Sequence, residues 1–210
     1  MRHPVLLALF AAGCGILPFG SKDDDRGVFD DSDADVDTDT DADTDTDVDL
    51  DEVSVVFKTS GAYSGNLVEI AGSGPPAAAA DTLCQLSAEG GGLTGTFKAW
   101  ISTANVDAID RIDNVGPWYL TSGDQVFLNA SGLVGSPAVG IEYDERGDVT
   151  IDSAWTGTQS GGRWSGVDCD SWSYGNGGGD GTTGSGYNDS WTDSSDRPCS
   201  ETHPLICFEQ

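Results

Sequence analysis

The chain has 210 residues, and its 36 Asp and Glu against nine Lys and Arg give it a formal net charge of −27. This charge excludes nucleic acid and anionic membrane surfaces as partners, because contacts with phosphate groups need Lys and Arg. A cationic or neutral partner, or calcium, fits the charge better, and the length allows one domain of ordinary size with appendages.

The first thirteen residues have the pattern of a secretory signal peptide. One Arg and one His precede an apolar run at residues 5–12, which is too short to span a membrane as a mature helix. The run ends in Ala11-Ala12-Gly13-Cys14, which resembles a bacterial lipobox except that Ala11 stands where Leu is usual. This resemblance implies that Cys14 carries the lipid, including palmitate, and becomes the first residue of the mature protein.

The number of cysteines supports an anchor at Cys14. The other four Cys lie within residues 84–207 and can pair with one another, which leaves Cys14 without a partner. Ordinary cleavage nearby, with Cys14 incidental, is the alternative. We expect a lipoprotein of the cell envelope, anchored in the outer membrane by its N-terminal lipid, with its domain in the periplasm or at the cell surface. No other segment is apolar enough to cross a bilayer.

Residues 14–52 have the composition of an acidic tether. Residues 21–52 contain sixteen Asp and Glu, and their basic residues are Lys22 and Arg26. Such a segment has no apolar face and repels itself, so we expect it to be disordered and to span roughly 35 Å as a flexible coil. The Asp-x-Asp repeat is also typical of calcium loops, but these loops need a Gly, and residues 29–51 contain none. A solvated spacer is therefore the expectation.

Residues 53–210 are expected to form the folded domain, which begins with a strand and a helix. Residues 53–59 are β-branched with alternating apolar positions, and this favours a strand. After a loop at residues 60–76, the Ala-rich and Leu-rich residues 77–89 predict a helix that the glycines at 90–92 stop. The residues expected to face inward from this helix are Leu83, Cys84 and Leu86.

The rest of the domain predicts short strands separated by turns. Residues 97–102 are typical of a largely buried strand. Gly and Asp turn signals, such as Ser122-Gly123-Asp124, separate the other candidates. Further strands are expected at residues 118–120, 125–128, 139–143, 149–151 and 154–158. One early helix followed by many short strands predicts an α+β domain that is mainly β.

Five short segments occur in one order along this domain. They are Ala80-Asp81-Thr82-Leu83-Cys84, Phe97-Lys98-Ala99-Trp100-Ile101-Ser102, Trp155-Thr156-Gly157-Thr158, Cys169-Asp170-Ser171-Trp172, and Cys199 with Ile206-Cys207-Phe208. In this order they resemble the endostatin-like domain of leptospiral and myxobacterial lipoproteins. That domain has no known function and is related in fold to endostatin and to C-type lectin-like domains. The resemblance covers residues 53–210.

Because the domain is expected to be exported, its four cysteines are expected to be oxidised to disulfides. Four cysteines allow three pairings, and the sequence alone does not choose among them. The resemblance implies the nested pairing, Cys84–Cys207 with Cys169–Cys199. The outer bridge would then tie the helix to the last strand, which stabilises the fold by about 4–5 kcal/mol on the chain-entropy account.

The residue types do not favour catalysis. His203 is the one histidine of the domain, and no Gly-x-Ser-x-Gly motif for a nucleophile occurs. The zinc ligands of endostatin have no evident counterparts here. The domain has twenty acidic and six basic residues, so carboxylate pairs suited to hydrolysis of extracellular polymers could form. The abundance of acidic residues does not by itself indicate a catalytic pair. We expect no enzyme, assign no catalytic residue, and name calcium as the one candidate cofactor.

The segment between Cys169 and Cys199 is the candidate binding loop. Calcium takes oxygen ligands from loops, and the candidate ligands here are Asp180, Asn188, Asp189, Asp193 and Asp196. Parts of the loop resemble the Trp-Asn-Asp run of C-type lectins, although the Glu-Pro-Asn triplet of the sugar-binding members is missing. A solvated loop that covers Trp191 is the alternative. The candidate aromatic contacts with a ligand are Trp172, Tyr187 and Trp191.

All six tryptophans lie in the domain. Trp100 and Trp155 have apolar strand neighbours and are expected in the core. The other four have Gly, Ser or Pro neighbours, where aromatic side chains are candidates for a contact surface. These four are Trp118, Trp164, Trp172 and Trp191.

Together these features predict a non-enzymatic lipoprotein that displays a ligand-binding or adhesion domain. The expected partner is an extracellular protein or a glycan, and the domain is expected to be monomeric. A calcium-dependent carbohydrate-binding protein of the lectin type is the alternative, and a hydrolase of extracellular polymers comes third.

Overall fold

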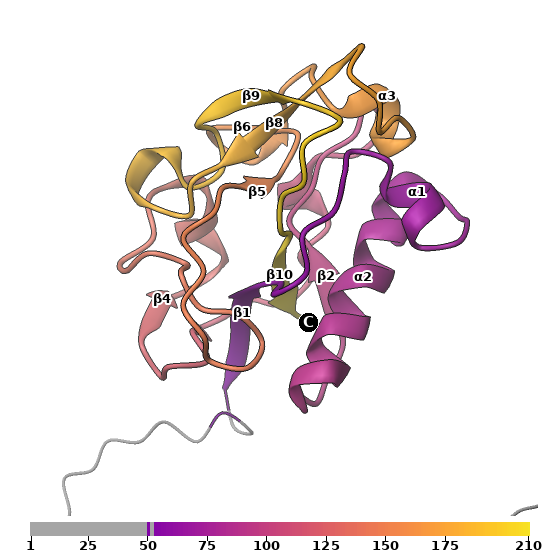
Figure 1. Cartoon of the computed structure of the whole chain (residues 1–210). Helices are drawn as coiled ribbons and strands as arrows, with labels where there is room; N and C mark the ends of the chain where they lie inside the picture. Colours follow the sequence, from indigo (N-terminus) through magenta and orange to yellow (C-terminus); the bar gives the residue numbers. More distant parts are fainter. Residues whose placement is uncertain (1–49, 51–52) are drawn as a thin grey trace, which may run out of the picture. The chain divides into compact units, whose positions relative to one another are not determined.

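The structure is a computed structural model that describes Leu50 and residues 53–210 (Figure 1). The expected signal peptide at residues 1–13, the lipidation site Cys14 and nearly all of the tether at 14–52 lie outside the described residues. Within the described part of the chain, no helix has both the length and the apolar character needed to cross a membrane.

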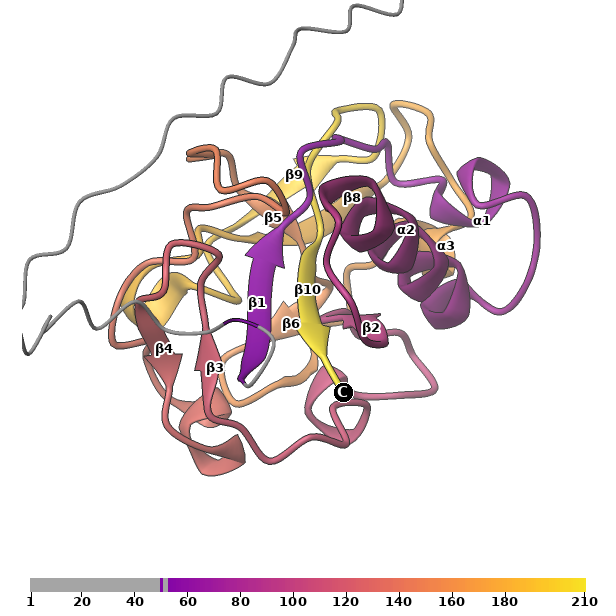
Figure 2. The same ribbon diagram turned by 90° about the horizontal axis from the view of Figure 1, so that it is seen from below.

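A five-stranded sheet joins the two ends of the domain. β1 (Ser54–Lys58) pairs antiparallel with β10 (Ile206–Glu209), and β10 pairs antiparallel with β2 (Phe97–Ala99). On its other side β1 pairs parallel with β3 (Trp118–Tyr119), which pairs antiparallel with β4 (Gln125–Phe127). Figure 2 shows the resulting order, β2-β10-β1-β3-β4. The first and last strands of the described domain therefore lie side by side within this sheet.

The expected helix is α2 (Pro76–Gly91), which packs along β2 and β10 (Figures 1 and 2). It ends at Gly92, whose φ of 81° is a left-handed conformation that Gly adopts at little cost. Leu83 and Cys84 are buried as predicted, but Leu86 is 58 % exposed, so the prediction for Leu86 is wrong. Leu86 lies about 200° around the helix from Cys84, which places it on the opposite face.

The other elements are short. A second, antiparallel sheet contains β5 (Ala154–Trp155), β8 (Asp180–Gly184) and β9 (Ser195–Pro198) in the order β5-β8-β9. The hairpin of β6 (Thr158–Gln159) and β7 (Arg163–Trp164) contacts this sheet at β8. The short helices are α1 (Leu67–Ile70), α3 (Cys169–Trp172), and the 3₁₀ turns η1 (Ala108–Asp110), η2 (Ala130–Val134) and η3 (Asn188–Ser190).

The strands expected at residues 139–143 and 149–151 are wrong. These two segments meet only at one isolated antiparallel bridge, between Tyr143 and Val149. Val149 and Ile151 are 65 % and 70 % exposed. Their β-branched side chains have no sheet face to cover, and tertiary contacts rather than β propensity decide whether such residues form a strand.

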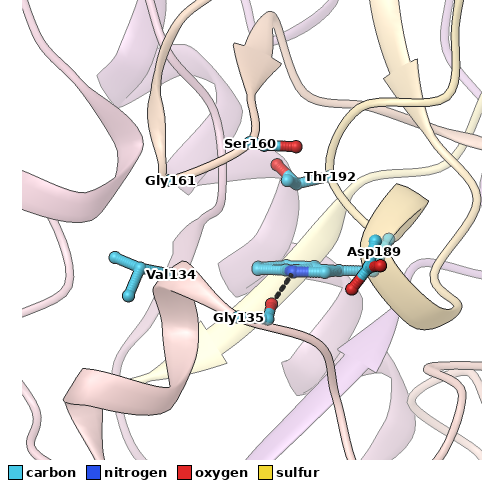
Figure 3. Close-up of a pocket in the computed structure, with 7 residues that line it drawn as sticks. Val134, Gly135, Ser160, Gly161, Asp189 and Thr192 are labelled. Atoms are coloured by element: carbon cyan, nitrogen blue, oxygen red, sulfur yellow. Dashed lines mark hydrogen bonds between the residues drawn. The ribbon is translucent and has the colours of Figure 1, made fainter.

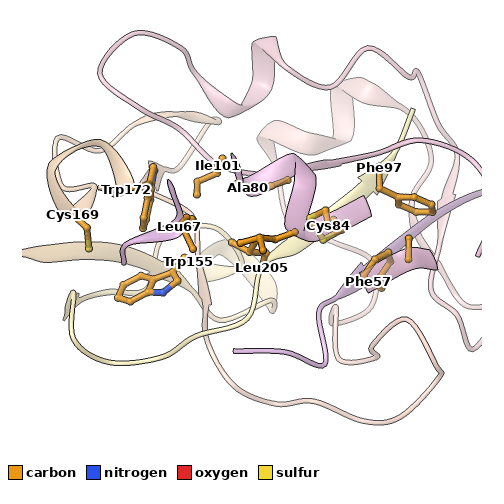
Figure 4. Close-up of a cluster of buried hydrophobic side chains, with 14 of the residues drawn as sticks. Phe57, Leu67, Ala80, Cys84, Phe97, Ile101, Trp155, Cys169, Trp172 and Leu205 are labelled. Atoms are coloured by element: carbon orange, nitrogen blue, oxygen red, sulfur yellow. A yellow bond between two sulfur atoms is a disulfide. The ribbon is translucent and has the colours of Figure 1, made fainter. Parts of the chain in front are cut away.

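Both faces of the five-stranded sheet are covered. Val55 and Phe57 of β1 belong to the cluster under α2, shown in Figure 4, whereas Val56 between them belongs to a second cluster rich in aromatic rings. This division follows from the strand geometry, because successive side chains point to opposite faces. Because β1 is buried on both faces, Val56 is apolar as well as its neighbours Val55 and Phe57.

Two disulfides link distant segments of the chain. One joins Cys84 in α2 to Cys207 in β10, and the other joins Cys169 in α3 to Cys199, which directly follows β9. They form the nested pairing, as predicted. The predicted α+β class with mainly short strands is also confirmed.

Candidate functional site

The loop closed by the Cys169–Cys199 disulfide begins with a strained turn. All four residues of α3 have φ between 51° and 58°, so α3 is a single left-handed turn. Residues other than Gly lose roughly 1–2 kcal/mol each in this conformation. Asp168 holds the turn, because its carboxylate accepts from the Ser171 N–H at 3.0 Å and its carbonyl accepts from the Trp172 N–H at 2.7 Å.

Trp172 and Trp118 are core residues, so the prediction that they contact a ligand at the surface is wrong. Both side chains are fully buried. The Trp172 Nε1–H donates to the Ser102 carbonyl at 2.9 Å, and the Trp118 Nε1–H donates to the Glu209 carbonyl at 3.1 Å. An indole can be buried among apolar neighbours when its N–H has a partner, and local polarity in the sequence does not reveal that partner. The two tryptophans predicted to be buried, Trp100 and Trp155, are indeed in the core.

A small hollow of about 170 Å³ opens over Trp191 (Figure 3). Three separate segments form it: the end of η2, the turn between β6 and β7, and η3 with the residues that follow it. We call it the Trp191 hollow, and its lining residues are Val134, Gly135, Ser160, Gly161, Asp189, Trp191 and Thr192. Two of them, Asp189 and Trp191, are site residues predicted from the sequence. The other five come from outside the predicted set.

The wall of the hollow is rigidly held. The Trp191 Nε1–H donates to the Gly135 carbonyl at 2.7 Å, marked by the dashed line in Figure 3. The ring of Trp191 packs against Trp100, with 4.8 Å between ring centroids, and against Phe127 at 5.2 Å. The Trp100 Nε1–H in turn donates to the hydroxyl of Thr192 at 2.7 Å. Trp191 is thus both a core residue, 1 % exposed, and the aromatic side of a surface hollow.

The remaining candidate calcium ligands are spread over the second sheet and its loops. Asp180 is the first residue of β8, and Asp196 lies in β9 opposite Thr182, whose hydroxyl donates to the Asp196 carboxylate at 2.8 Å. Asn188 and Asp193 flank the hollow on the chain and are exposed. Among the described residues, no group of three or more His, Cys, Asp or Glu gathers in a way that could hold a metal ion. Calcium binding therefore stays a prediction.

Lys58 is a buried cation that the sequence did not point to. Its side chain is fully buried at the end of β1, and its ammonium donates to the carbonyls of Asp152 at 2.8 Å and Ser185 at 3.0 Å. It also lies over the ring of Tyr187, 5.8 Å from the centroid. Burial lowers the pKa of Lys58 to about 8, against the opposing effect of the Glu142 and Asp152 carboxylates. A lysine at the end of an alternating strand normally reaches solvent, so no sequence signal could have found this site.

Tyr187, the third candidate aromatic contact, belongs to this buried cluster. Its side chain is half-buried, and a hydrogen bond to Glu142, together with burial, raises the pKa of the Tyr187 phenol to about 12. Lys58, Glu142 and Tyr187 thus connect β1 to two loops that are distant in the sequence. Tyr187 does not line the Trp191 hollow.

His203 is held by structural contacts. Its Nδ1 lies 2.8 Å from the Ser153 carbonyl, which requires the proton on Nδ1, and its ring packs edge-on against Trp155. Its Nε2 lies 3.4 Å from the Glu201 carboxylate. Within the described residues, Nε2 is buried and has no hydrogen-bond partner.

No protein-family model matches the chain, and a search of curated proteins finds no match.

Proposed function

We propose that this chain is a lipid-anchored protein of the cell envelope that displays a non-enzymatic ligand-binding or adhesion domain, and that the Trp191 hollow is its binding site. The domain is proposed to have the endostatin-like and C-type lectin-like fold. Two features support this proposal: the nested disulfides, and the packing and disulfide linkage of α2 to the last strand, β10.

The observation that carries the proposal is the way the hollow is built. Three segments from separate parts of the chain meet over the indole of Trp191. The Trp191 Nε1–H donates to the Gly135 carbonyl, and the Trp100 Nε1–H donates to the Thr192 hydroxyl. Binding sites are typically concave and place a few polar groups beside apolar or aromatic walls.

An array of glycans and extracellular matrix proteins tests this proposal. We expect the wild-type protein to bind at least one class of immobilised ligand. Ser160→Trp places a bulky ring at the exposed rim of the hollow, so it should abolish that binding. Ser200→Trp adds the same ring at another exposed serine of the domain, away from the hollow, and should leave binding intact. Equal binding by wild-type protein and the Ser160→Trp variant would contradict the assignment of the site.

The same array, run with and without a chelator, tests the calcium-dependent lectin alternative. That alternative requires glycan binding that is lost with the chelator. It also requires a rise in melting temperature at millimolar calcium that Asp189→Ala removes. No rise at millimolar calcium rules the alternative out.

A further inference from the structure

The six basic side chains of residues 53–210 are all engaged within the domain. Lys58 is buried against backbone carbonyls, and the other five each pair with a carboxylate. These pairs are Lys98–Asp113, Arg111–Asp81, Arg146–Glu145, Arg163–Asp107 and Arg197–Glu201. The same residues contain twenty Asp and Glu, so the domain has a net charge of −14. The described part of the chain therefore has a large acidic excess, and each of its basic side chains lies near a carboxylate or a backbone carbonyl.

Among the described residues that line the Trp191 hollow, the one charged side chain is an acceptor, the carboxylate of Asp189. The two indole N–H groups beside it are used internally, one by the Gly135 carbonyl and the other by the Thr192 hydroxyl. Asp189 is exposed at the hollow, and its carboxylate accepts one hydrogen bond, from the Ser136 hydroxyl. A carboxylate has about four lone-pair sites, so most of its capacity stays open. The fitting ligand group is therefore a donor, and next to Asp189 a positively charged donor.

The size and the aromatic wall of the hollow narrow the class of ligand. About 170 Å³ corresponds to roughly five or six water molecules at about 30 Å³ each, which is room for a charged head group on a narrow chain. The ring of Trp191 is 1 % exposed and closes the base of this space, whereas Val134 is 56 % exposed and offers an apolar surface to the chain. Gly135 and Gly161 place no side chain in this space.

We propose that the Trp191 hollow binds the ammonium group of a lysine side chain presented by an extracellular protein. The ammonium donates to the Asp189 carboxylate, and the methylene stem lies against Val134, above the base formed by Trp191. This inference rests on the proposed binding function and gives it a ligand class. It also gives the acidic excess of the domain a role, because long-range attraction would speed the approach of a basic partner.

The direct test is a titration of the full-length exported protein with Nα-acetyl-lysine methylamide, followed through the Trp191 Nε1–H resonance by NMR. We expect millimolar binding that weakens as ionic strength rises, because exposed charges are screened. The Nε-acetylated form of the same probe has no charge and should not bind. Binding of both forms with equal strength would overturn the proposal.

Two matched variants separate a specific contact from the general charge. Asp189→Asn should weaken binding by at least about tenfold, since it removes a charged hydrogen-bond acceptor. Asp193→Asn removes the same charge from a nearby exposed residue that does not line the hollow, and it should change binding by less than about twofold. Equal weakening by both variants would show that only the net charge matters and would overturn the lysine site.

The array experiment distinguishes failure of this inference from failure of the proposed function. If Ser160→Trp abolishes binding of an array ligand but the lysine probe does not bind, the hollow is a binding site for another class of ligand. In that case the lysine inference is overturned and the proposed function stands. If Ser160→Trp leaves array binding unchanged while the lysine probe binds, the hollow holds a lysine side chain but is not the site of the array ligand. In that case the assignment of the adhesion site to the hollow is overturned.

Discussion

The ammonium of Lys58 in β1 lies 5.8 Å above the ring centroid of Tyr187, a residue of the loop closed by Cys169 and Cys199. The same ammonium donates to the carbonyl of Ser185 in that loop and to the carbonyl of Asp152. One buried side chain of the first strand thus fixes the segment that leads into η3 and the Trp191 hollow. The position of the candidate site therefore depends on a group far from it in the sequence.

The first prediction concerns the pH dependence of stability. The pKa of Lys58 is about 8 in the folded protein, against 10.5 for the free side chain. Between these pH values the unfolded chain binds more protons, so the free energy of unfolding should rise with pH, by up to about 3 kcal/mol in full. The pKa of Tyr187, raised from 10.0 to about 12, acts in the opposite sense above pH 10. We therefore expect a rise from pH 8 to pH 10 and no further gain beyond it.

Urea unfolding at pH 7, 8, 9 and 10 measures this rise. The Lys58→Met variant should be nearly flat over the same range, because it has no buried ammonium. An NMR titration of the Lys58 side chain, with a midpoint near pH 8, gives the same answer without a variant. A midpoint above pH 10 would contradict the effect of burial.

The second prediction compares the two disulfides. Cys84 and Cys207 are 123 residues apart, whereas Cys169 and Cys199 are 30 apart. On the chain-entropy account the longer loop contributes about 5 kcal/mol and the shorter about 3.5 kcal/mol. The double variant Cys84→Ser/Cys207→Ser should therefore be less stable in urea than Cys169→Ser/Cys199→Ser. The reverse order would mean that local contacts in the shorter loop outweigh chain entropy.

The third prediction concerns the close approach of β8 to Trp191. A Cβ atom on Gly184 would lie 2.7 Å from the Thr192 Cα and closer still to the Trp191 carbonyl oxygen. Gly184→Ala should lower the free energy of unfolding by about 2 kcal/mol or more, because backbone atoms would have to move. It should also shift the Trp191 Nε1–H resonance.

Gly177 is the matched control in the same loop. A Cβ atom there meets only the Ser200 hydroxyl, at 3.9 Å. Gly177→Ala should leave stability within about 1 kcal/mol of wild type or raise it slightly, since it restricts the unfolded chain. Comparable losses in the two variants would contradict the steric account.

The fourth prediction uses the left-handed turn of α3. Asp170 is exposed with φ 54°, so Asp170→Gly relieves roughly 1–2 kcal/mol of strain against an entropic cost of roughly 0.5–1 kcal/mol. Thermal unfolding should show a net gain of about 0.5–1 kcal/mol. Ser173→Gly, at φ −110°, has no strain to relieve and should be destabilising. A loss of stability in Asp170→Gly would indicate that its carboxylate has a structural role.

The fifth prediction concerns the anchor. Replacing Cys14 by Ser removes the proposed lipidation site, so the protein should move from the membrane fraction to the soluble fraction on cell fractionation. Metabolic labelling with a radioactive fatty acid should be lost in the same variant. Equal membrane association of the variant and the wild type would place the anchor elsewhere.

The local sequence pattern was sufficient to predict some secondary-structure elements of the domain. Ala-rich and Leu-rich residues between Pro76 and Gly92 predict α2, and the β-branched residues beside Lys58 predict β1. Each of these depends on propensity and on Gly or Pro at the ends, which act within a few residues. The pattern failed where burial decides, as for Leu86, which lies on the outer face of its helix, and for Val149, which has no strand to pair with.

The segment between Cys169 and Cys199 shows the same division. Composition alone shows that this segment is a Gly-rich and Asp-rich loop between two cysteines. Which of its residues meet depends on long-range packing. Trp172 turns into the core, whereas Trp191 becomes the wall of a hollow that η2 and the β6–β7 turn complete. A hollow is formed by segments distant in the chain, and hydrogen bonds such as that from Trp191 to Gly135 join residues that no local pattern relates.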